Sequence, residues 1–321
     1  MVPFTMKKKY IIAIVLTICC AVCWFGVEYN VLPYIAIRPQ RIDIHQMERF
    51  KSGGPISSHG SSAIDFDVMS HDGVPIDAVL LRAESPKATI ILVHGIGACK
   101  EFFIDLALRL THDQFNVVLF DLRAQGQSGG DYCTYGAKET GDIRCLVDSL
   151  VGIQPNTPIG IYGTSLGGAL ALLALANDQR IQCGIIESTY HRLETVMNKY
   201  WTDWTSLNCP NLVRRTMYRS AAIAGFDPTQ VDPLSACQRI ACPILFAHGD
   251  QDEKIPLAFN WQNYEAVQGN KKEFITIHGA GHLNVHAVGG QAYYDKMIRF
   301  LNSSLSHPNA DTSHTVMPTK E

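Results

Sequence analysis

A serine between regularly spaced glycines is the first feature of this 321-residue chain that could do chemistry. It lies in Gly163-Thr164-Ser165-Leu166-Gly167-Gly168, after the apolar run Ile159–Tyr162 and before the helix-favouring run 169–176. Glycines two residues before and two residues after Ser165 allow a sharp turn from strand to helix, which exposes the hydroxyl. A serine that caps a helix also fits the pattern. Because strand and helix both flank it, the stretch predicts a nucleophile.

A serine nucleophile needs a general base, and histidine is the usual one. His278 and His282 both follow the last predicted strand, and we favour His282, which lies beside Gly281 and farther from the strand. His286 falls in the following helix and is expected at the surface. A metal site at His278 and His282 is not expected, since no carboxylate supports the pair and the loop is rich in glycine. We expect no metal and no cofactor.

The base in turn needs an acid that fixes its tautomer, and the order nucleophile, acid, histidine is the one expected for this strand order. Two aspartates follow the predicted strand 244–247. Asp250 comes directly after Gly249 and favours a turn-capping role. Asp252 stands farther out on the loop, so we favour it as the acid.

The elements that must position these residues are strands alternating with helices. Continuous apolar strands separated by helices predict a mostly parallel sheet covered on both faces. Two runs flank the turn Asp72-Gly73 and predict a hairpin that adds antiparallel strands at one edge, 64–68 and 76–81. We expect eight strands in all. The candidate residues, together with His94, Asp121 and Glu187, follow predicted strands, at the edge where such sheets bind ligands.

An insertion at about residues 189–236 interrupts the alternation between the sixth and seventh strands. Apolar and aromatic residues recur in it at helical spacing, among them Tyr200, Trp201 and Trp204. This face either packs on the domain below or forms a small helical lid that lines an acyl or aromatic substrate pocket. The sequence does not separate the two interpretations.

The N-terminus differs in character from the rest. Three lysines, 7–9, precede the uncharged run Tyr10–Val27, which Glu28 ends. A membrane span needs about 17–25 apolar residues, whereas the core of a signal peptide needs about 7–15 and a cleavage site that is poor here. We favour an uncleaved anchor, with the lysines cytoplasmic and the domain on the other side of the membrane. The alternative is a cleaved signal and a secreted or periplasmic enzyme.

The expected organisation is an anchor or signal segment over 1–30, a linker over 31–60, one catalytic domain over 61–305, and a disordered tail over 306–321. A net charge of −3 without long charge runs gives no indication of nucleic-acid binding. The cysteines outside the N-terminal apolar run are odd in number and form no C-x-x-C pair, so we expect mostly core residues and no metal framework. The oligomeric state is not predicted.

Five motifs together resemble the α/β-hydrolase superfamily over about 64–305, and within it most resemble the serine aminopeptidases and prolyl-oligopeptidase-like hydrolases. They are His94-Gly95-Ile96-Gly97, Asp121-Leu122-Arg123-Ala124-Gln125-Gly126-Gln127-Ser128, Gly163–Gly167, His248-Gly249-Asp250-Gln251-Asp252 and Gly281-His282. The resemblance implies the acid at Asp252 and an oxyanion hole formed by the backbone N–H groups of Ile96 and Leu166. It also implies a structural Arg123. Ala124 departs from the family's usual glycine.

The residues thus predict a membrane-tethered serine hydrolase of the α/β-hydrolase fold. Its substrate is a small carboxylic ester, cleaved through Ser165, His282 and Asp252 by way of an acyl-enzyme. Serine rather than aspartate at the nucleophile position argues against epoxide or haloalkane chemistry. The alternatives are a peptidase or amidase, or an acyltransferase, with the same triad, and a tethered binding protein without catalysis.

Overall fold

The computed structural model describes residues 4–42 and 63–305, so the predicted tail and most of the predicted linker lie outside the described residues. Its central sheet has eight strands in the order β1-β4-β6-β5-β7-β8-β9-β10. Pairing is antiparallel for β1 with β4 and β4 with β6, and parallel across the rest. The predicted mostly parallel sheet is therefore confirmed. Its strands are β1 (Ala63–Asp65), β4 (Ala78–Leu81), β5 (Ala88–Val93), β6 (Phe115–Phe120), β7 (Ile159–Thr164), β8 (Ile181–Glu187), β9 (Ile244–Gly249) and β10 (Lys272–Ile277).

The expected hairpin is present in two parts. Ala63 of β1 pairs with Leu81 of β4 at the sheet edge. Nearer the turn, β2 (Val68–Met69) and β3 (Pro75–Ile76) form a separate two-stranded ribbon. The chain therefore leaves the main sheet for the ribbon and returns to it.

Helices cover both faces of the sheet, as expected for strands that are apolar on both sides. Alternate residues of β5 belong to different cores: Ile91 and Val93 to one, Ile90 and Leu92 to the other. The first core is closed by α5 (Glu139–Ile153), α6 (Leu166–Asn177), α9 (Pro233–Cys237) and α10 (Leu257–Ala266). The second is closed by α4 (Ile104–His112), which follows a 3₁₀ turn over Lys100–Phe103, and by α11 (Val285–Leu305).

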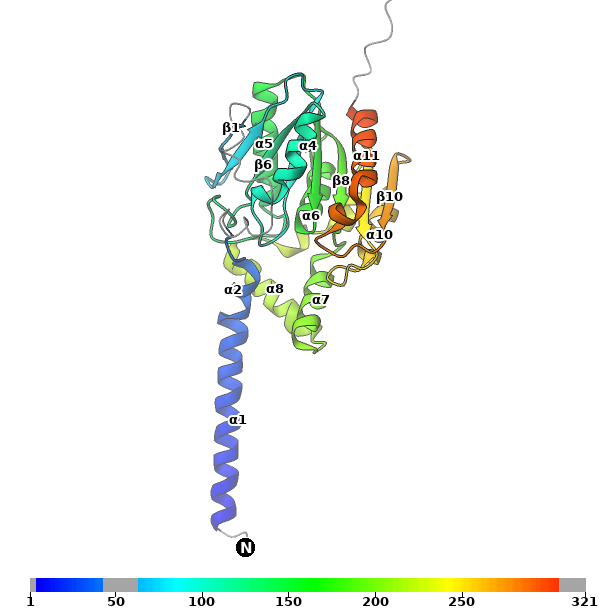
Figure 1. The fold of residues 1–321 in the computed structure, drawn as a ribbon. Coiled ribbons are helices and arrows are strands. Elements are labelled where there is room, and N and C mark those ends of the chain that lie inside the picture. The colour runs from blue at the N-terminus through cyan, green and yellow to red at the C-terminus, as the bar shows by residue number, and fades with distance from the viewer. Residues whose placement is uncertain (1–3, 43–62, 306–321) are drawn as a thin grey trace, which may run out of the picture.

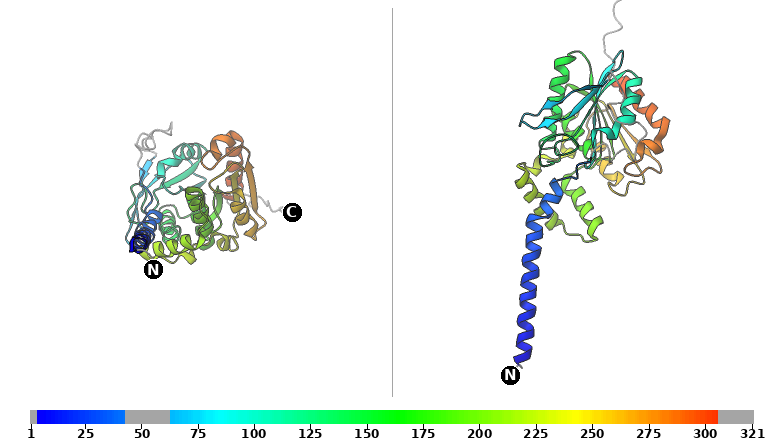
Figure 2. Two further views of the ribbon diagram at one scale, coloured as in Figure 1. Left: turned by 90° about the horizontal axis from the view of Figure 1, so that it is seen from below. Right: turned by 60° about the vertical axis from the view of Figure 1, so that its left-hand side comes forward.

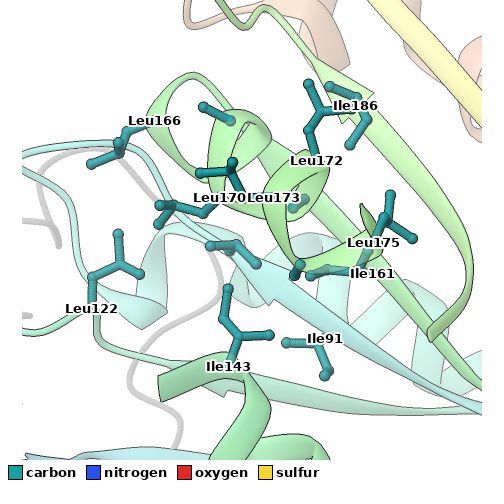
Figure 3. Close-up of a cluster of buried hydrophobic side chains, with 14 of the residues drawn as sticks. Ile91, Leu122, Ile143, Ile161, Leu166, Leu170, Leu172, Leu173, Leu175 and Ile186 are labelled. Carbon is teal, nitrogen blue, oxygen red and sulfur yellow. The ribbon is translucent and has the colours of Figure 1, made fainter. Parts of the chain in front are cut away.

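Helix α6 is buried on all sides, and its leucines pack against Ile91, Ile161 and Ile186 of the sheet (Figure 3). Full burial of each such side chain contributes about 1.5–3 kcal/mol. The residue that precedes this helix, Ser165, is thus held by an element buried in the core.

The insertion forms two contacting helices, α7 (Leu193–Thr205) and α8 (Pro210–Ala224), followed by a 3₁₀ turn over Pro228–Gln230. Ser206 ends α7 in the left-handed conformation (φ 58°), and proline begins α8. Both helices lie at the end of the domain from which the N-terminal helix projects (Figure 1).

Helix α1 (Phe4–Asn30) projects from the domain as a single rod (Figures 1 and 2). The segment Ala13–Ile37 is long and apolar enough to cross a membrane or to be a signal sequence, and almost none of it is buried. The expected N-terminal apolar helix is therefore present.

The start of the predicted linker is not a free connector. Residues Leu32–Ile37 form helix α2, in which Pro33 and Ile37 are buried. Beyond it, the Arg41 guanidinium donates hydrogen bonds to the backbone carbonyls of Gly126, Ser128 and Gly130. The prediction missed this because six residues with a proline give too short a periodic pattern to indicate a packed helix.

Candidate active site

Ser165 lies at the turn between β7 and α6 in a conformation that side chains rarely adopt, with φ 55° and ψ −121°. The flanking glycines are required by close packing. A Cβ on Gly163 would lie 2.2 Å from the carbonyl oxygen of Gly167, and one on Gly167 would lie 2.0 Å from that of Val93. Backbone atoms cannot move aside as a flexible side chain would. The sequence spacing therefore corresponds to a turn in which strand and helix backbones touch.

A chain of hydrogen bonds links Ser165 to His282 and Asp252. His282 Nε2 lies 3.1 Å from Ser165 Oγ, and His282 Nδ1 lies 2.8 Å from Asp252 Oδ2. Because an ionised carboxylate only accepts hydrogen bonds, the ring proton belongs on Nδ1. Nε2 is then unprotonated and accepts from the serine hydroxyl, which is the arrangement that a general base requires.

Four donors surround the Asp252 carboxylate. Oδ1 accepts from the backbone N–H groups of Lys254 and Ile255, at 3.0 and 2.9 Å. Oδ2 faces His282 and also His248, whose Nε2 lies 3.3 Å away and 2.9 Å from the Ile255 carbonyl oxygen. Burial by itself would raise the pKa of Asp252, but hydrogen bonds from His248 and His282 lower it well below its usual value. The carboxylate is therefore ionised at neutral pH.

Asp250 and His278, the other two candidates that follow these strands, are instead partnered with each other. Asp250 Oδ2 lies 2.8 Å from His278 Nδ1, and Asp250 Oδ1 accepts from the Gly279 N–H at 2.7 Å. His278 is largely exposed. Asp250 thus ties the end of β10 to the end of β9, and within the described residues neither Asp250 nor His278 forms a hydrogen bond with Ser165.

The loop that follows β5 is fixed against the nucleophile. His94 is buried and its Nδ1 donates to the Gly95 carbonyl oxygen at 2.8 Å, so Nε2 accepts the Leu122 N–H at 3.0 Å. Burial lowers the pKa of His94, which keeps the ring neutral. A Cβ on Gly95 would lie 3.3 Å from Ser165 Cβ, so glycine permits this approach.

Ile96 follows Gly95 on this loop, and Leu166 opens α6. Both residues line the same pocket as Ser165. The N–H groups of the first helical turn have no partner within the helix, which leaves that of Leu166 available to a ligand. The two residues that the resemblance implies for an oxyanion hole therefore line the pocket that contains the hydroxyl, and their role as its donors stays a prediction.

A pocket of about 450 Å³ opens at Ser165. Its walls come from α2, α7 and α8 as well as from the sheet edge, and no charged side chain is among the described residues that line it. Tyr200, Trp201 and Trp204 belong to this wall, whereas Leu193 and Val196 of α7 are also buried against the core. The helix thus both packs and lines the pocket; its action as a moving lid stays a prediction. The lining residues are Leu32, Ile35, Ala36, Ile96, Tyr135, Ser165, Leu166, Tyr190, Leu193, Val196, Met197, Tyr200, Trp201, Trp204, Val213, Thr216 and Met217.

The remaining polar residues at the strand ends serve the scaffold. The Arg123 guanidinium is buried and bonds Asp142 and Asp72 at 2.6–3.1 Å. Glu187 accepts from Tyr293 Oη at 3.0 Å and lies 3.3 Å from His286 Nε2. His286 is thus half-buried and paired, not the surface histidine expected from the sequence.

The sequence reasoning missed two contributions to the site. One is His248, which the sequence could have indicated by its position at a strand end, four residues before Asp252. The other is the wall that α2 supplies through Leu32, Ile35 and Ala36. Their apolar spacing was the available signal, although the sequence predicts a linker there.

Comparisons with known proteins agree with the fold and with a serine hydrolase. Residues 84–219 match the family described as serine aminopeptidase, S33. The chain is 28% identical over 237 residues to the uncharacterized protein YqkD of Bacillus subtilis (strain 168), covering 68% of this chain and 70% of that one. It is 25% identical over 281 residues to an (R)-3-hydroxydecanoyl-ACP:CoA transacylase of Ectopseudomonas oleovorans, covering 75% and 90%. A Pyrococcus furiosus esterase structure superposes with a TM-score of 0.68 at 22% identity, covering 85% of this chain and all of that one.

Proposed function

The chain belongs to the α/β-hydrolase superfamily and is a serine hydrolase, and we propose that it cleaves carboxylic esters through Ser165, His282 and Asp252. The observation that carries the proposal is the continuous hydrogen-bonded chain from carboxylate to hydroxyl, which ends at an apolar pocket.

In this mechanism His282 Nε2 removes the Ser165 proton as Oγ attacks the ester carbonyl carbon. Negative charge develops on the carbonyl oxygen, and the N–H groups of Ile96 and Leu166 stabilise it. His282, now protonated and paired with Asp252, gives its proton to the leaving alkoxide. The acyl group then remains on Ser165. Water activated by the same histidine attacks the acyl-enzyme and releases the acid.

The character of the pocket supports an ester with an apolar acyl chain. An aminopeptidase must hold a charged α-amino group, and a fixed carboxylate is the natural partner for it. None of the described residues that line the pocket is acidic. Aliphatic and aromatic side chains instead favour burial of a hydrocarbon, at about 25 cal/mol per Å².

Two further activities use the same residues. Peptide or amide cleavage is supported by the name of the matching family, and acyl transfer by the transacylase relative. In acyl transfer an alcohol or thiol, rather than water, attacks the acyl-enzyme. Product analysis with an added alcohol acceptor separates transfer from hydrolysis.

We also propose that α1 remains attached as a membrane anchor, with the catalytic domain on the non-cytoplasmic side. Support comes from the length and apolar character of the helix and from the lysines at its start. Protease treatment of intact cells tests the orientation. Protection of the domain both in intact cells and after the outer barriers are opened would mean that it faces the cytoplasm.

The direct test of the mechanism is covalent labelling by a fluorophosphonate probe. The wild-type protein should take the label and Ser165→Ala should not. A panel of p-nitrophenyl esters and aminoacyl p-nitroanilides then compares ester with amide cleavage. Folded wild-type protein that neither labels nor hydrolyses any ester would overturn the proposal.

A further inference from the structure

One face of α8 is basic and exposed. Its solvent-facing residues recur at intervals of three and four, and the helix contains three arginines and no acidic residue. Arginine is positively charged at all relevant pH values and binds phosphate oxygens through two parallel hydrogen bonds. We call this surface the α8 outer face; its members are Asn211, Arg214, Arg215, Tyr218, Arg219 and Ala222.

The α8 outer face adjoins the end of the proposed anchor. Arg215 Nε donates to Glu28 Oε1 at 2.8 Å, and the Arg219 guanidinium carbon lies 5.6 Å from the centre of the Tyr29 ring. A groove of about 380 Å³ runs between α8 and the last turn of α1. These arginines therefore lie at the level where a helix that spans a bilayer would leave it.

Two large apolar side chains are exposed where α7 ends and the connection to α8 begins. Trp204 is 71% exposed and Leu207 is 58% exposed. This connection points in the direction in which α1 projects (Figure 1). Tryptophan favours the boundary between head groups and acyl chains, since its ring is apolar with one polar edge.

Helix α8 lies between the α8 outer face and the substrate pocket. Thr216 of α8 lines both the groove and the pocket, and Trp204 lines the pocket as well. Leu32, Ile35 and Ala36 of α2, which continues directly from α1, form another wall. The pocket is thus enclosed by the elements nearest the proposed membrane.

We propose that the α8 outer face docks on anionic phospholipid head groups of the membrane that α1 crosses, with Leu207 and Trp204 entering the interface. The pocket then receives its acyl ester from the bilayer, so the substrate class is a membrane-resident acyl ester. The proposal rests on the ester hydrolysis and the anchoring proposed above. Charge complementarity and continuity with the anchor select the lipid surface as the partner.

The test uses the full chain in lipid nanodiscs of phosphatidylcholine alone or with phosphatidylglycerol. Two substrates are compared: a soluble short-chain p-nitrophenyl ester and a fluorogenic long-chain ester embedded in the disc. We expect phosphatidylglycerol to raise hydrolysis of the embedded ester alone. The double variant Arg214→Gln, Arg219→Gln should lose this gain in the rate of embedded-ester hydrolysis. The loss should be up to about fivefold for each arginine removed. Leu207→Asp should lower hydrolysis of the embedded ester in both kinds of disc.

Matched controls change exposed residues on elements away from α8. Arg144→Gln with Arg299→Gln removes the same charge, and Ile153→Asp adds an equivalent acid at an exposed apolar position. Both should leave the activity ratio of the two substrates unchanged. The docking proposal is overturned if the ratio of embedded-ester to soluble-ester hydrolysis is the same for wild type and the α8 variants in both kinds of disc.

If the proposed catalysis is wrong, the result is different, because wild type would then hydrolyse neither ester. Hydrogen–deuterium exchange of residues 204–219 still decides docking in that case. Slower exchange in phosphatidylglycerol discs, lost in the arginine double variant, supports it. Identical exchange in both kinds of disc refutes it.

Discussion

Replacement of Asp252 by asparagine tests whether its carboxylate holds His282 in the correct tautomer. Asparagine has nearly the same shape, but one of its two terminal groups is an NH₂ that donates. In the protein, two backbone N–H groups point at Oδ1 and two imidazole N–H groups point at Oδ2. The amide therefore opposes two donors whichever way it turns.

The energies of the two orientations decide the outcome. An NH₂ placed against the Lys254 and Ile255 N–H groups leaves these fixed donors unpaired, at about 1–3 kcal/mol for each buried group. An NH₂ placed against His248 and His282 costs less free energy. His282 can move its proton from Nδ1 to Nε2, and His248 Nε2 keeps the Ile255 carbonyl oxygen as a partner. The second orientation should prevail, with His282 in the tautomer that cannot accept the Ser165 proton.

The expected result for Asp252→Asn is a fall in kcat of roughly 10⁴ with little change in KM. The measurement is p-nitrophenyl ester hydrolysis, together with the rate of fluorophosphonate labelling. Asp250→Asn is the matched control, because that carboxylate bonds His278 and Gly279 instead; its activity should stay within about twofold of wild type, as for a surface change. The reasoning is refuted if Asp252→Asn stays active while Asp250→Asn does not.

Three other changes have defined outcomes. Trp201→Ala enlarges the pocket and should shift the preference among p-nitrophenyl esters toward longer chains; an unchanged profile would indicate that Trp201 only packs. Ala124 has φ 59°, so Ala124→Gly should raise the free energy of unfolding by about 0.5–1 kcal/mol in urea denaturation. The hydrogen bond from Arg123 lowers the pKa of Asp72 from 3.8 to about 2. Because the unfolded chain binds the proton more readily, stability should fall as pH drops from about 4 to 2, and Asp72→Asn should flatten that slope.

The parts of the fold that the sequence predicted are those fixed by local pattern. Strands β5 and β6 are continuous apolar runs because both of their faces are buried, and the glycines around Ser165 are required by backbone contact. Such constraints produce regular patterns of residue types in the sequence. The end of the sheet at which chemistry gathers follows from the parallel arrangement itself.

The choice between neighbouring candidates could not be made with the same certainty. His278 and His282 both follow β10 within a few residues, as Asp250 and Asp252 follow β9. Which of them face Ser165 depends on loop dihedrals, which no periodic pattern encodes. The second donor on Asp252, His248, was hidden for a related reason: its burial depends on how β9 meets α10, a contact between distant parts of the chain.

The packing of residues Leu32–Ile37 could not be predicted, because the local pattern there does not indicate the tertiary contacts. The apolar run indicates a membrane helix and Pro33 suggests that it ends there, but residues Leu32–Ile37 form a further helix, α2, which packs on α8. Ser220 Oγ donates to the Pro33 carbonyl oxygen at 3.0 Å, and Arg215 pairs with Glu28. Since α8 and α2 are both walls of the pocket, a tilt of α1 relative to the domain would either strain these contacts or move the walls.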